Sequence, residues 1–178
     1  MAIDIKKVFA DTMVKLLKEK PFDQITIKDL CAACGASRQT FYNHFYDKYD
    51  LIVWMCKKQF QALWASFQDH KKSFRDFMIE VYRMFLENQA FYSIVMGIDG
   101  PNSFRDFLMG FTKDYYRNAL EASGKTMDDE LEYVISFCTV GTIEMATNWV
   151  KNGFRQTPEQ MIEYQLLCCP DLLKPYLE

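Results

Sequence analysis

Apolar residues recur along almost the whole chain at the three-to-four-residue spacing of an amphipathic α-helix. The first such run starts at Ile5, two short ones start at Thr26 and Ser37, and a long one extends from about Lys48 to His70. No segment shows the strict alternation of a strand, so the pattern predicts an all-α fold of about nine helices. Beyond the long helix, the five further helices are expected near residues 73–87, 88–97, 103–122, 128–152 and 158–169.

Residues at the ends of the short segments predict how these helices start and stop. The Thr26 hydroxyl can cap a helix, and Asp29, three residues later, completes a box-like arrangement. Gly35 stands where a left-handed C-cap is expected, because glycine adopts that geometry without strain. Ser37 and Asp47 are suited to cap the next two helices. The sequence therefore predicts two short helices joined by a tight corner.

This pair of helices, over residues 26–45, has the length and punctuation of a helix-turn-helix. A helix fits the major groove of DNA, where Arg can read guanine, Gln or Asn can read adenine, and Thr can touch a thymine methyl group. From spacing alone, a polar surface on an ordinary helical pair remains the alternative. The candidate contacts to bases and phosphates are Thr26, Lys28, Ser37, Arg38, Gln39, Thr40, Tyr42, Asn43, His44 and Lys48.

The segment from Thr26 to Leu51 resembles the N-terminal signature of the TetR family of transcription regulators, and the resemblance extends over residues 1–55. It departs from the family pattern at Cys31 and Cys34, where the family often has alanine or another small apolar residue. The resemblance implies a homodimer that reads a pseudo-palindromic operator in double-stranded DNA, with contacts at the positions named above. The matching residues include Phe41, Tyr42, His44, Phe45, Asp47, Lys48 and Leu51.

Within this family, the chain is similar to a subgroup that contains a TetR-like coactivator of dihydroxyacetone kinase genes. The likeness depends on the segments Arg38–Asn43 and Glu87–Tyr92, together with Trp54 and Phe60. The family as a whole implies a repressor that a small-molecule effector releases from DNA. The subgroup implies an alternative, in which the signal is a partner protein and the output is activation.

We expect two domains: a helix-turn-helix DNA-binding domain over residues 1–47, and a C-terminal helical regulatory and dimerisation domain over residues 48–178. Residues 1–50 contain eight Lys or Arg and seven Asp or Glu, a net charge of +1. The remainder has thirteen and seventeen, a net charge of −4, and the two sums give the total of −3. The difference has the sign expected for an N-terminal DNA-binding domain, but it is small.

The counts of 15 Phe, 10 Tyr and 10 Met exceed what one core of this size usually needs. They indicate an interior cavity or a subunit interface. A packed core without any ligand is the alternative that periodicity alone leaves open. The candidate ligand-binding residues, which lie at helical spacing, are Phe60, Tyr82, Phe85, Phe107, Phe111, Tyr115 and Met145.

The last two long helical segments are the candidates for a four-helix dimer interface, which the resemblance also implies. Gly141 would permit the close approach of another helix. The alternative is that this apolar stripe belongs to the core of a single chain. The candidate interface residues are Ile135, Thr142, Trp149, Met161 and Cys168.

Other classes of function have weaker support. No apolar run approaches the roughly 20 residues that cross a bilayer, and no signal-peptide core is present, so we expect a cytoplasmic protein without a membrane role whose six cysteines are thiols. The pairs Cys31/Cys34 and Cys168/Cys169 leave thiol-based redox sensing open, but two histidines are too few for a standard zinc site. No phosphate loop or catalytic signature occurs, so we expect no enzyme, catalytic residue, metal or cofactor. A helical adaptor that does not bind DNA is the remaining alternative.

Overall fold

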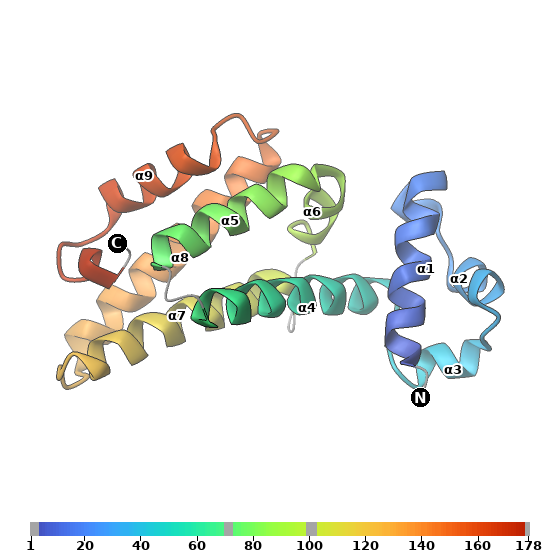
Figure 1. Ribbon diagram of the computed structural model, residues 1–178, viewed down its shortest axis with the longest axis horizontal. Helices are drawn as coiled ribbons and strands as arrows, with labels where there is room; N and C mark the ends of the chain where they lie inside the picture. Colours follow the sequence, from blue (N-terminus) through green and yellow to red (C-terminus); the bar gives the residue numbers. More distant parts are fainter. Residues whose placement is uncertain (1–3, 70–72, 99–102, 177–178) are drawn as a thin grey trace. The chain divides into compact units, whose positions relative to one another are not determined.

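The computed structural model describes residues 4–69, 73–98 and 103–176, and within these ranges every regular element is a helix (Figure 1). The predicted all-α fold is confirmed, and each expected helix is present with ends within a few residues of those predicted; His70 lies outside the described residues. No helix in these ranges could span a lipid bilayer. The elements are α1 (Ile5–Glu19), η1 (Phe22–Gln24), α2 (Ile27–Cys34), α3 (Arg38–Tyr42), α4 (Lys48–Asp69), α5 (Phe74–Glu87), α6 (Gln89–Val95), α7 (Phe104–Ala122), α8 (Asp129–Lys151), α9 (Pro158–Cys168) and η2 (Lys174–Tyr176).

Side-chain caps fix the starts of most helices, as their sequences predict. Thr26 and Asp29 form a complete capping box on α2, and the Asp47 carboxylate accepts from two amides at the start of α4, those of Tyr49 and Asp50. Each cap satisfies backbone amides that have no partner within the helix. The remaining capping side chains are Asp4, Ser37, Ser73, Ser103, Asp128 and Thr157.

The chain divides into two compact units, one ending at Lys58 and the other beginning at Gln59. The division therefore lies inside α4, whereas the predicted domain boundary lies at residue 47. The first half of α4 belongs to the N-terminal unit because its side chains complete that unit's core. One example is Trp54, whose ring centroid lies 5.8 Å from that of Phe45.

The core of the N-terminal unit is built on three phenylalanines. Phe9 of α1 and Phe41 of α3 are fully buried, and their rings meet edge to face with centroids 5.1 Å apart. Phe45 lies against both rings, 6.4 Å from Phe9 and 5.7 Å from Phe41. Edge-to-face contacts are a preferred geometry of aromatic pairs. They fasten the inner side of α3 and leave its other side facing outward.

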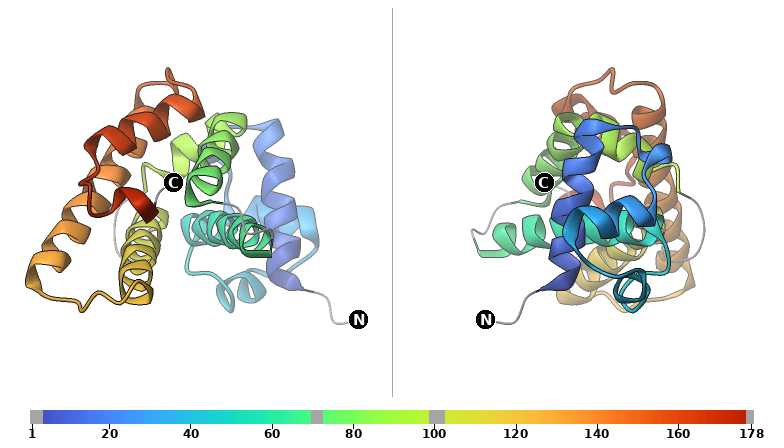
Figure 2. Two further views of the ribbon diagram at one scale, coloured as in Figure 1. Left: turned by 60° about the vertical axis from the view of Figure 1, so that its left-hand side comes forward. Right: turned by 90° about the vertical axis from the view of Figure 1, so that its right-hand side faces the viewer.

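In the C-terminal unit, α5 packs along α9 and α7 packs along α8. Figures 1 and 2 show α9 returning beside α8 in the opposite direction. The centre of the unit is a cluster of aromatic rings around Phe60, whose centroid lies 4.8 Å from that of Phe111 and 5.3 Å from that of Phe77. Most of these rings contact one another edge to face, which gives a dense core.

Candidate nucleic-acid interface and regulatory surfaces

Gly35 makes the corner between α2 and α3. Its φ of 71° and ψ of 16° lie in the left-handed region, and no atom lies within 4 Å of where a Cβ would stand. Backbone conformation, and not lack of space, is therefore what favours glycine here. The Ala36 amide donates to the Cys31 carbonyl across the corner (3.1 Å), and Ser37 then caps α3. The predicted helix-turn-helix corner is confirmed.

The start of α2 carries a network around the Asp29 carboxylate. One carboxylate oxygen accepts from Lys20 Nζ (2.7 Å), from the Thr26 hydroxyl (2.8 Å) and from the Thr26 amide (2.9 Å). The Lys20 ammonium first, and then the Thr26 donors, hold the pKa of Asp29 well below its ordinary value. Because Lys20 neutralises this carboxylate, the exposed Thr26 and Lys28 can meet an anionic phosphate at the N-terminus of α2.

The outer face of α3 presents hydrogen-bonding side chains. Arg38, Gln39 and Asn43 are exposed, and 54% of the Tyr42 surface is accessible. Gln39 Nε2 donates to Asn43 Oδ1 at 3.0 Å, which holds these two amide groups side by side one turn apart. With Phe41 anchored in the core on the other side, α3 is a rigid carrier for this polar face.

The other predicted contacts on this motif surround α3. Ser37 is exposed, Thr40 is half-buried, and their hydroxyl oxygens lie 2.9 Å apart. His44 is half-buried directly after the helix. All three remain within the same local surface as the outer face of α3.

Lys48 has a different role from the predicted phosphate contact. Its ammonium group donates to the carbonyl oxygens of Phe22 and Ile25, both at 2.9 Å, and of Asp23 at 3.2 Å. It also lies 4.5 Å from the centroid of the Phe22 ring. An ammonium has three N–H groups, and these three carbonyls use all of them. Lys48 therefore fastens the loop before α2 to the start of α4, and we no longer count it among the DNA contacts.

Tyr46 was not among the predicted contacts, yet 86% of its surface is exposed. It follows Tyr42 by four residues and lies just beyond the end of α3. An exposed phenol beside a polar helix face is suited to donate to a phosphate oxygen. The four-residue spacing from Tyr42 was the signal that could have identified it.

The predicted ligand pocket is almost filled. Phe60, Tyr82, Phe85 and Phe111 do line one cavity at the centre of the C-terminal unit, but its volume is only about 20 Å³. That is room for about one water molecule. The expectation of an effector-sized central cavity is therefore wrong for this conformation, because the rings pack against one another.

The other predicted pocket residues lie elsewhere. The Phe107 ring packs on Phe60, with centroids 5.4 Å apart. Tyr115 stacks on Phe74 at 3.8 Å, and Met145 lines pockets beside α9. Helical spacing predicted the inward sides of these helices but not which side chains share a cavity.

The predicted dimer residues are mostly interior. Ile135, Trp149 and Met161 are at most 3% exposed within the single chain, and Thr142 is also buried. An interface between copies cannot depend on side chains already enclosed by their own chain, so these four assignments are wrong. Only Cys168 is exposed.

A neighbouring face of α8 and α9 is apolar and exposed. It is defined here as the α8–α9 face and includes Phe137, exposed over 72% of its surface, and Leu167, exposed over 79%. Gly141 lies on the same side, with open space where a Cβ would stand. Contiguous exposed apolar side chains of this size usually mark an interaction site. The large side chains of the face are Tyr133, Phe137, Val140, Tyr164 and Leu167.

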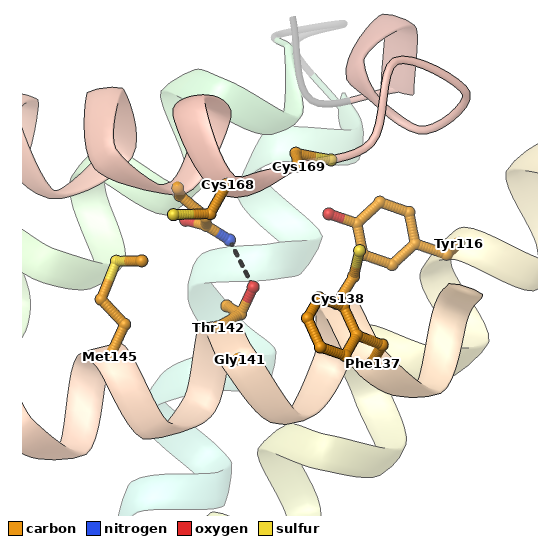
Figure 3. Close-up of a pocket in the computed structure, with 9 residues that line it drawn as sticks. Tyr116, Phe137, Cys138, Gly141, Thr142, Met145, Cys168 and Cys169 are labelled. Atoms are coloured by element: carbon orange, nitrogen blue, oxygen red, sulfur yellow. Dashed lines mark hydrogen bonds between the residues drawn. The ribbon is translucent and has the colours of Figure 1, made fainter. Parts of the chain in front are cut away.

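A pocket of about 250 Å³ opens beside this face, between α7, α8 and the end of α9 (Figure 3). Gln165 forms part of its wall: its amide nitrogen donates to the Thr142 hydroxyl (3.1 Å), and its amide oxygen accepts from the buried Tyr82 hydroxyl (3.3 Å). The lining residues are Tyr116, Phe137, Cys138, Gly141, Thr142, Met145, Gln165, Cys168 and Cys169.

The cysteine pair on α2 has little reactive character. Cys31 is buried, and burial, with the nearby Cys34, raises the pKa of its thiol. Cys34 donates to the Cys31 carbonyl oxygen at 3.8 Å. Among the described residues, no group of three or more His, Cys, Asp or Glu side chains could hold a metal ion.

Comparisons with known proteins agree with this arrangement. A model of the bacterial regulatory proteins of the tetR family matches residues 11–53, which contain the helix-turn-helix. A model of the TetR C-terminal class, described as transcriptional regulator C-terminal region, matches residues 72–166. The two matches together cover both structural units.

Among curated proteins, the chain is 28% identical over 98 residues to the HTH-type dhaKLM operon transcriptional activator DhaS of Lactococcus lactis. This alignment covers 55% of the chain and 52% of the relative, so it spans about half the length of that protein. The chain is also 33% identical over 51 residues to an uncharacterized HTH-type transcriptional regulator, YwcC, of Bacillus subtilis, covering 29% of the chain and 23% of the relative.

Solved structures share the fold. The dihydroxyacetone kinase operon activator DhaS superposes with a TM-score of 0.65 at 20% identity, covering 98% of the chain and 99% of the other. A TetR regulator from Streptococcus agalactiae gives 0.66 at 22%, and Thermus thermophilus FadR in complex with lauroyl-CoA gives 0.63 at 13%, each covering 91% of both chains. A C-terminal model matching more than half of the chain, a tetR-family model matching its helix-turn-helix and this shared fold together show that the chain belongs to the TetR family of transcriptional regulators.

Proposed function

We propose that this regulator binds a pseudo-palindromic operator as a homodimer, with α3 of each copy in the major groove. The observation that carries the proposal is the two-sided character of α3: Phe41 is anchored in the core, and Arg38, Gln39 and Asn43 project outward. Arg can pair with guanine and the two amides can pair with adenine. These side chains are the candidates for reading sequence.

A second group of side chains would fix the register of the protein on DNA. Thr26 and Lys28 stand at the N-terminus of α2, where backbone amides and the helix dipole favour a phosphate. Ser37, Thr40 and His44 border α3, and the exposed phenols of Tyr42 and Tyr46 complete the surface. Phosphate contacts of this kind strengthen binding to all sequences about equally.

We assign dimerisation to the α8–α9 face. Its large exposed side chains need a partner, and Gly141 allows a second helix to approach closely. A two-fold arrangement would pair the same patch on both copies and bring four helices together. The proposal keeps the helices that the sequence predicts for the interface and replaces most of the residues.

A repressor released by a small-molecule effector is the output that we propose first. An effector can release DNA only if it binds more tightly to one spacing of the two α3 helices than to the other. The second candidate is an activator that responds to a partner protein. It is favoured by the similarity to the activator DhaS and by the central cavity of only about 20 Å³.

The test is selection of bound DNA from a random duplex pool, followed by titrations of the enriched sequence. We expect a pseudo-palindrome whose half-sites lie one helical turn apart or a multiple of it. Arg38→Ala should weaken binding and relax the preference at one base pair of each half-site. The control is Glu121→Gln, because Glu121 is exposed on α7 in the other unit. A pool that shows no common sequence, or a titration that Arg38→Ala does not affect, would refute the proposal.

The two outputs are separated with a reporter gene placed behind the selected operator. A repressor lowers expression and an activator raises it when the protein is produced. An activator of the second kind should also require an additional protein for its effect.

A further inference from the structure

Three of the six cysteines lie in one place, in the wall of the 250 Å³ pocket (Figure 3). Cys138 comes from α8, and Cys168 and Cys169 come from the end of α9. The pocket opens at the surface, because Phe137 and Cys168 in its lining are exposed. A cavity of roughly 150 Å³ is enough to hold benzene, so this pocket has room for a somewhat larger ring compound.

Cys169 is the thiol with the most nucleophilic surroundings. Figure 3 shows the Tyr116 hydroxyl directed toward Cys138 and Cys169. The Cys138 thiol and the Tyr116 hydroxyl both hydrogen-bond to Cys169, and these donors, the Cys138 thiol first, lower the pKa of Cys169. When it is protonated, Cys169 Sγ instead donates to the Pro170 carbonyl (3.6 Å). The thiolate is the reactive form of cysteine.

Tyr116 and Cys138 themselves stay protonated. Burial raises the pKa of the Tyr116 phenol, which is only 1% exposed. The hydrogen bond to Cys169, together with burial, raises the pKa of the Cys138 thiol. Of the three neighbouring groups, Cys169 is therefore the one that ionises first, and the other two remain donors to it.

The rest of the wall determines what kind of molecule can enter. Phe137, Met145 and Gly141 are apolar and suit a hydrocarbon ring. Thr142 provides a polar point: its hydroxyl accepts from Gln165 and still has a proton of its own to offer to an acceptor. The pocket thus combines an apolar body, one hydrogen-bond donor for a carbonyl oxygen and a nucleophile.

We propose that this pocket binds a small apolar α,β-unsaturated carbonyl compound and that Cys169 adds to it covalently. The Cys169 thiolate forms a carbon–sulfur bond to the β-carbon, and the π electrons of the C=C bond move onto the α-carbon and carbonyl oxygen. The α-carbon then takes up one proton, which replaces the proton that the thiol released. The product is a thioether, and no oxidant or reductant takes part.

The adduct would also reach the α8–α9 face, since Phe137 belongs both to that face and to the pocket wall. An effect of the adduct on dimerisation or DNA binding therefore depends on the proposed function. Adduct formation itself does not, so it is measured first and separately.

The test uses the full-length protein and 2-cyclohexen-1-one, followed by intact-protein mass spectrometry and peptide mapping. We expect one early adduct, at Cys169, with a rate that saturates as the probe concentration rises because binding precedes reaction. Cys169→Ser should abolish this adduct, and Cys168→Ser, which changes an exposed neighbour, should leave it. Tyr116→Phe should slow the reaction roughly tenfold at neutral pH and move its pH profile upward, since one unit of thiol pKa corresponds to a factor of ten.

Several outcomes would overturn the proposal. These are labelling of Cys168 before Cys169, labelling of Cys169 only after denaturation, or a second copy of the chain filling the pocket so that no adduct forms in the dimer. A rate that Tyr116→Phe leaves unchanged would equally refute the role of this hydroxyl. Circular dichroism of each variant verifies folding, and operator titration of the adduct is read only afterwards, so a failure of DNA binding is not confused with a failure of this reaction.

Discussion

Neighbouring residues of α3 show how packing and recognition are divided. Phe41 is fully buried between Phe9 and Phe45, and the next residue, Tyr42, is more than half exposed. The buried ring fixes the orientation of the helix, so the polar side chains need little further ordering when they meet DNA. Preorganisation of this kind reduces the entropic cost of binding.

Gln39→Ala should cost about 1–3 kcal/mol of operator affinity and relax specificity at one base pair. The reason is the loss of an amide that is already oriented by its 3.0 Å hydrogen bond to Asn43. Titrations against an operator series with single base-pair changes measure this directly. If every operator weakens by the same factor, Gln39 does not read sequence.

Gly35→Ala should destabilise the N-terminal unit by about 1 kcal/mol, because alanine is strained at a positive φ. The space around the Cβ position is open, so no steric clash adds to this cost. Urea unfolding of the variant measures the change in free energy, with Ala36→Gly as a comparison at the adjacent position. An unchanged midpoint would mean that the corner relaxes to another geometry.

At the level of helices, most starts could be predicted because caps are local. Thr26, Ser37 and Asp47 act on amides two or three residues away, so the sequence alone contains the whole interaction. The role of Lys48 could not be predicted in this way. Its carbonyl partners lie 23 to 26 residues earlier in the chain, and only the tertiary fold brings them together.

Helix α8 shows a second limit of sequence patterns. It has two apolar sides, one containing Ile135 and Trp149 and the other containing Tyr133 and Phe137. Periodicity identifies both sides as apolar but does not say which one the chain's own helices cover. The prediction selected the buried side for the dimer for this reason. The pocket prediction failed similarly, because spacing along a helix contains no information about the free volume between helices.

The start of α2 gives a pH-dependent prediction. The folded pKa of Asp29 is lowered, so its network stabilises the protein above the unfolded pKa of about 4, and this contribution is lost as the pH falls through the folded pKa. Asp29→Asn should therefore destabilise the protein at pH 7 and differ progressively less from the wild type below about pH 4. Urea unfolding at several pH values tests this, with Asp11→Asn, at an exposed position of α1, as the control. A difference that does not change with pH would contradict the assignment.

For the whole molecule, the α8–α9 face makes the dimer testable. Leu167→Asp should weaken dimerisation by about 2 kcal/mol or more per copy, because a large exposed apolar side chain would lose its burial between copies. Sedimentation should then show monomer at concentrations where the wild type is dimeric, and operator affinity should fall with it. Val14→Asp is the matched control, since Val14 is an exposed apolar residue of α1. Equal sedimentation of both variants would exclude this face.

The density of rings around Phe60 also sets the kinetics of any molecule that binds at the centre of the C-terminal unit. With only about 20 Å³ free, such a molecule can enter only a conformer in which Phe111 or another ring has swung aside. Its apparent dissociation constant is then the intrinsic one divided by the fraction of open conformers. At high concentrations, its association rate would reach a plateau equal to the rate at which the rings open. A stopped-flow trace that saturates in this way would measure how often the protein opens by itself.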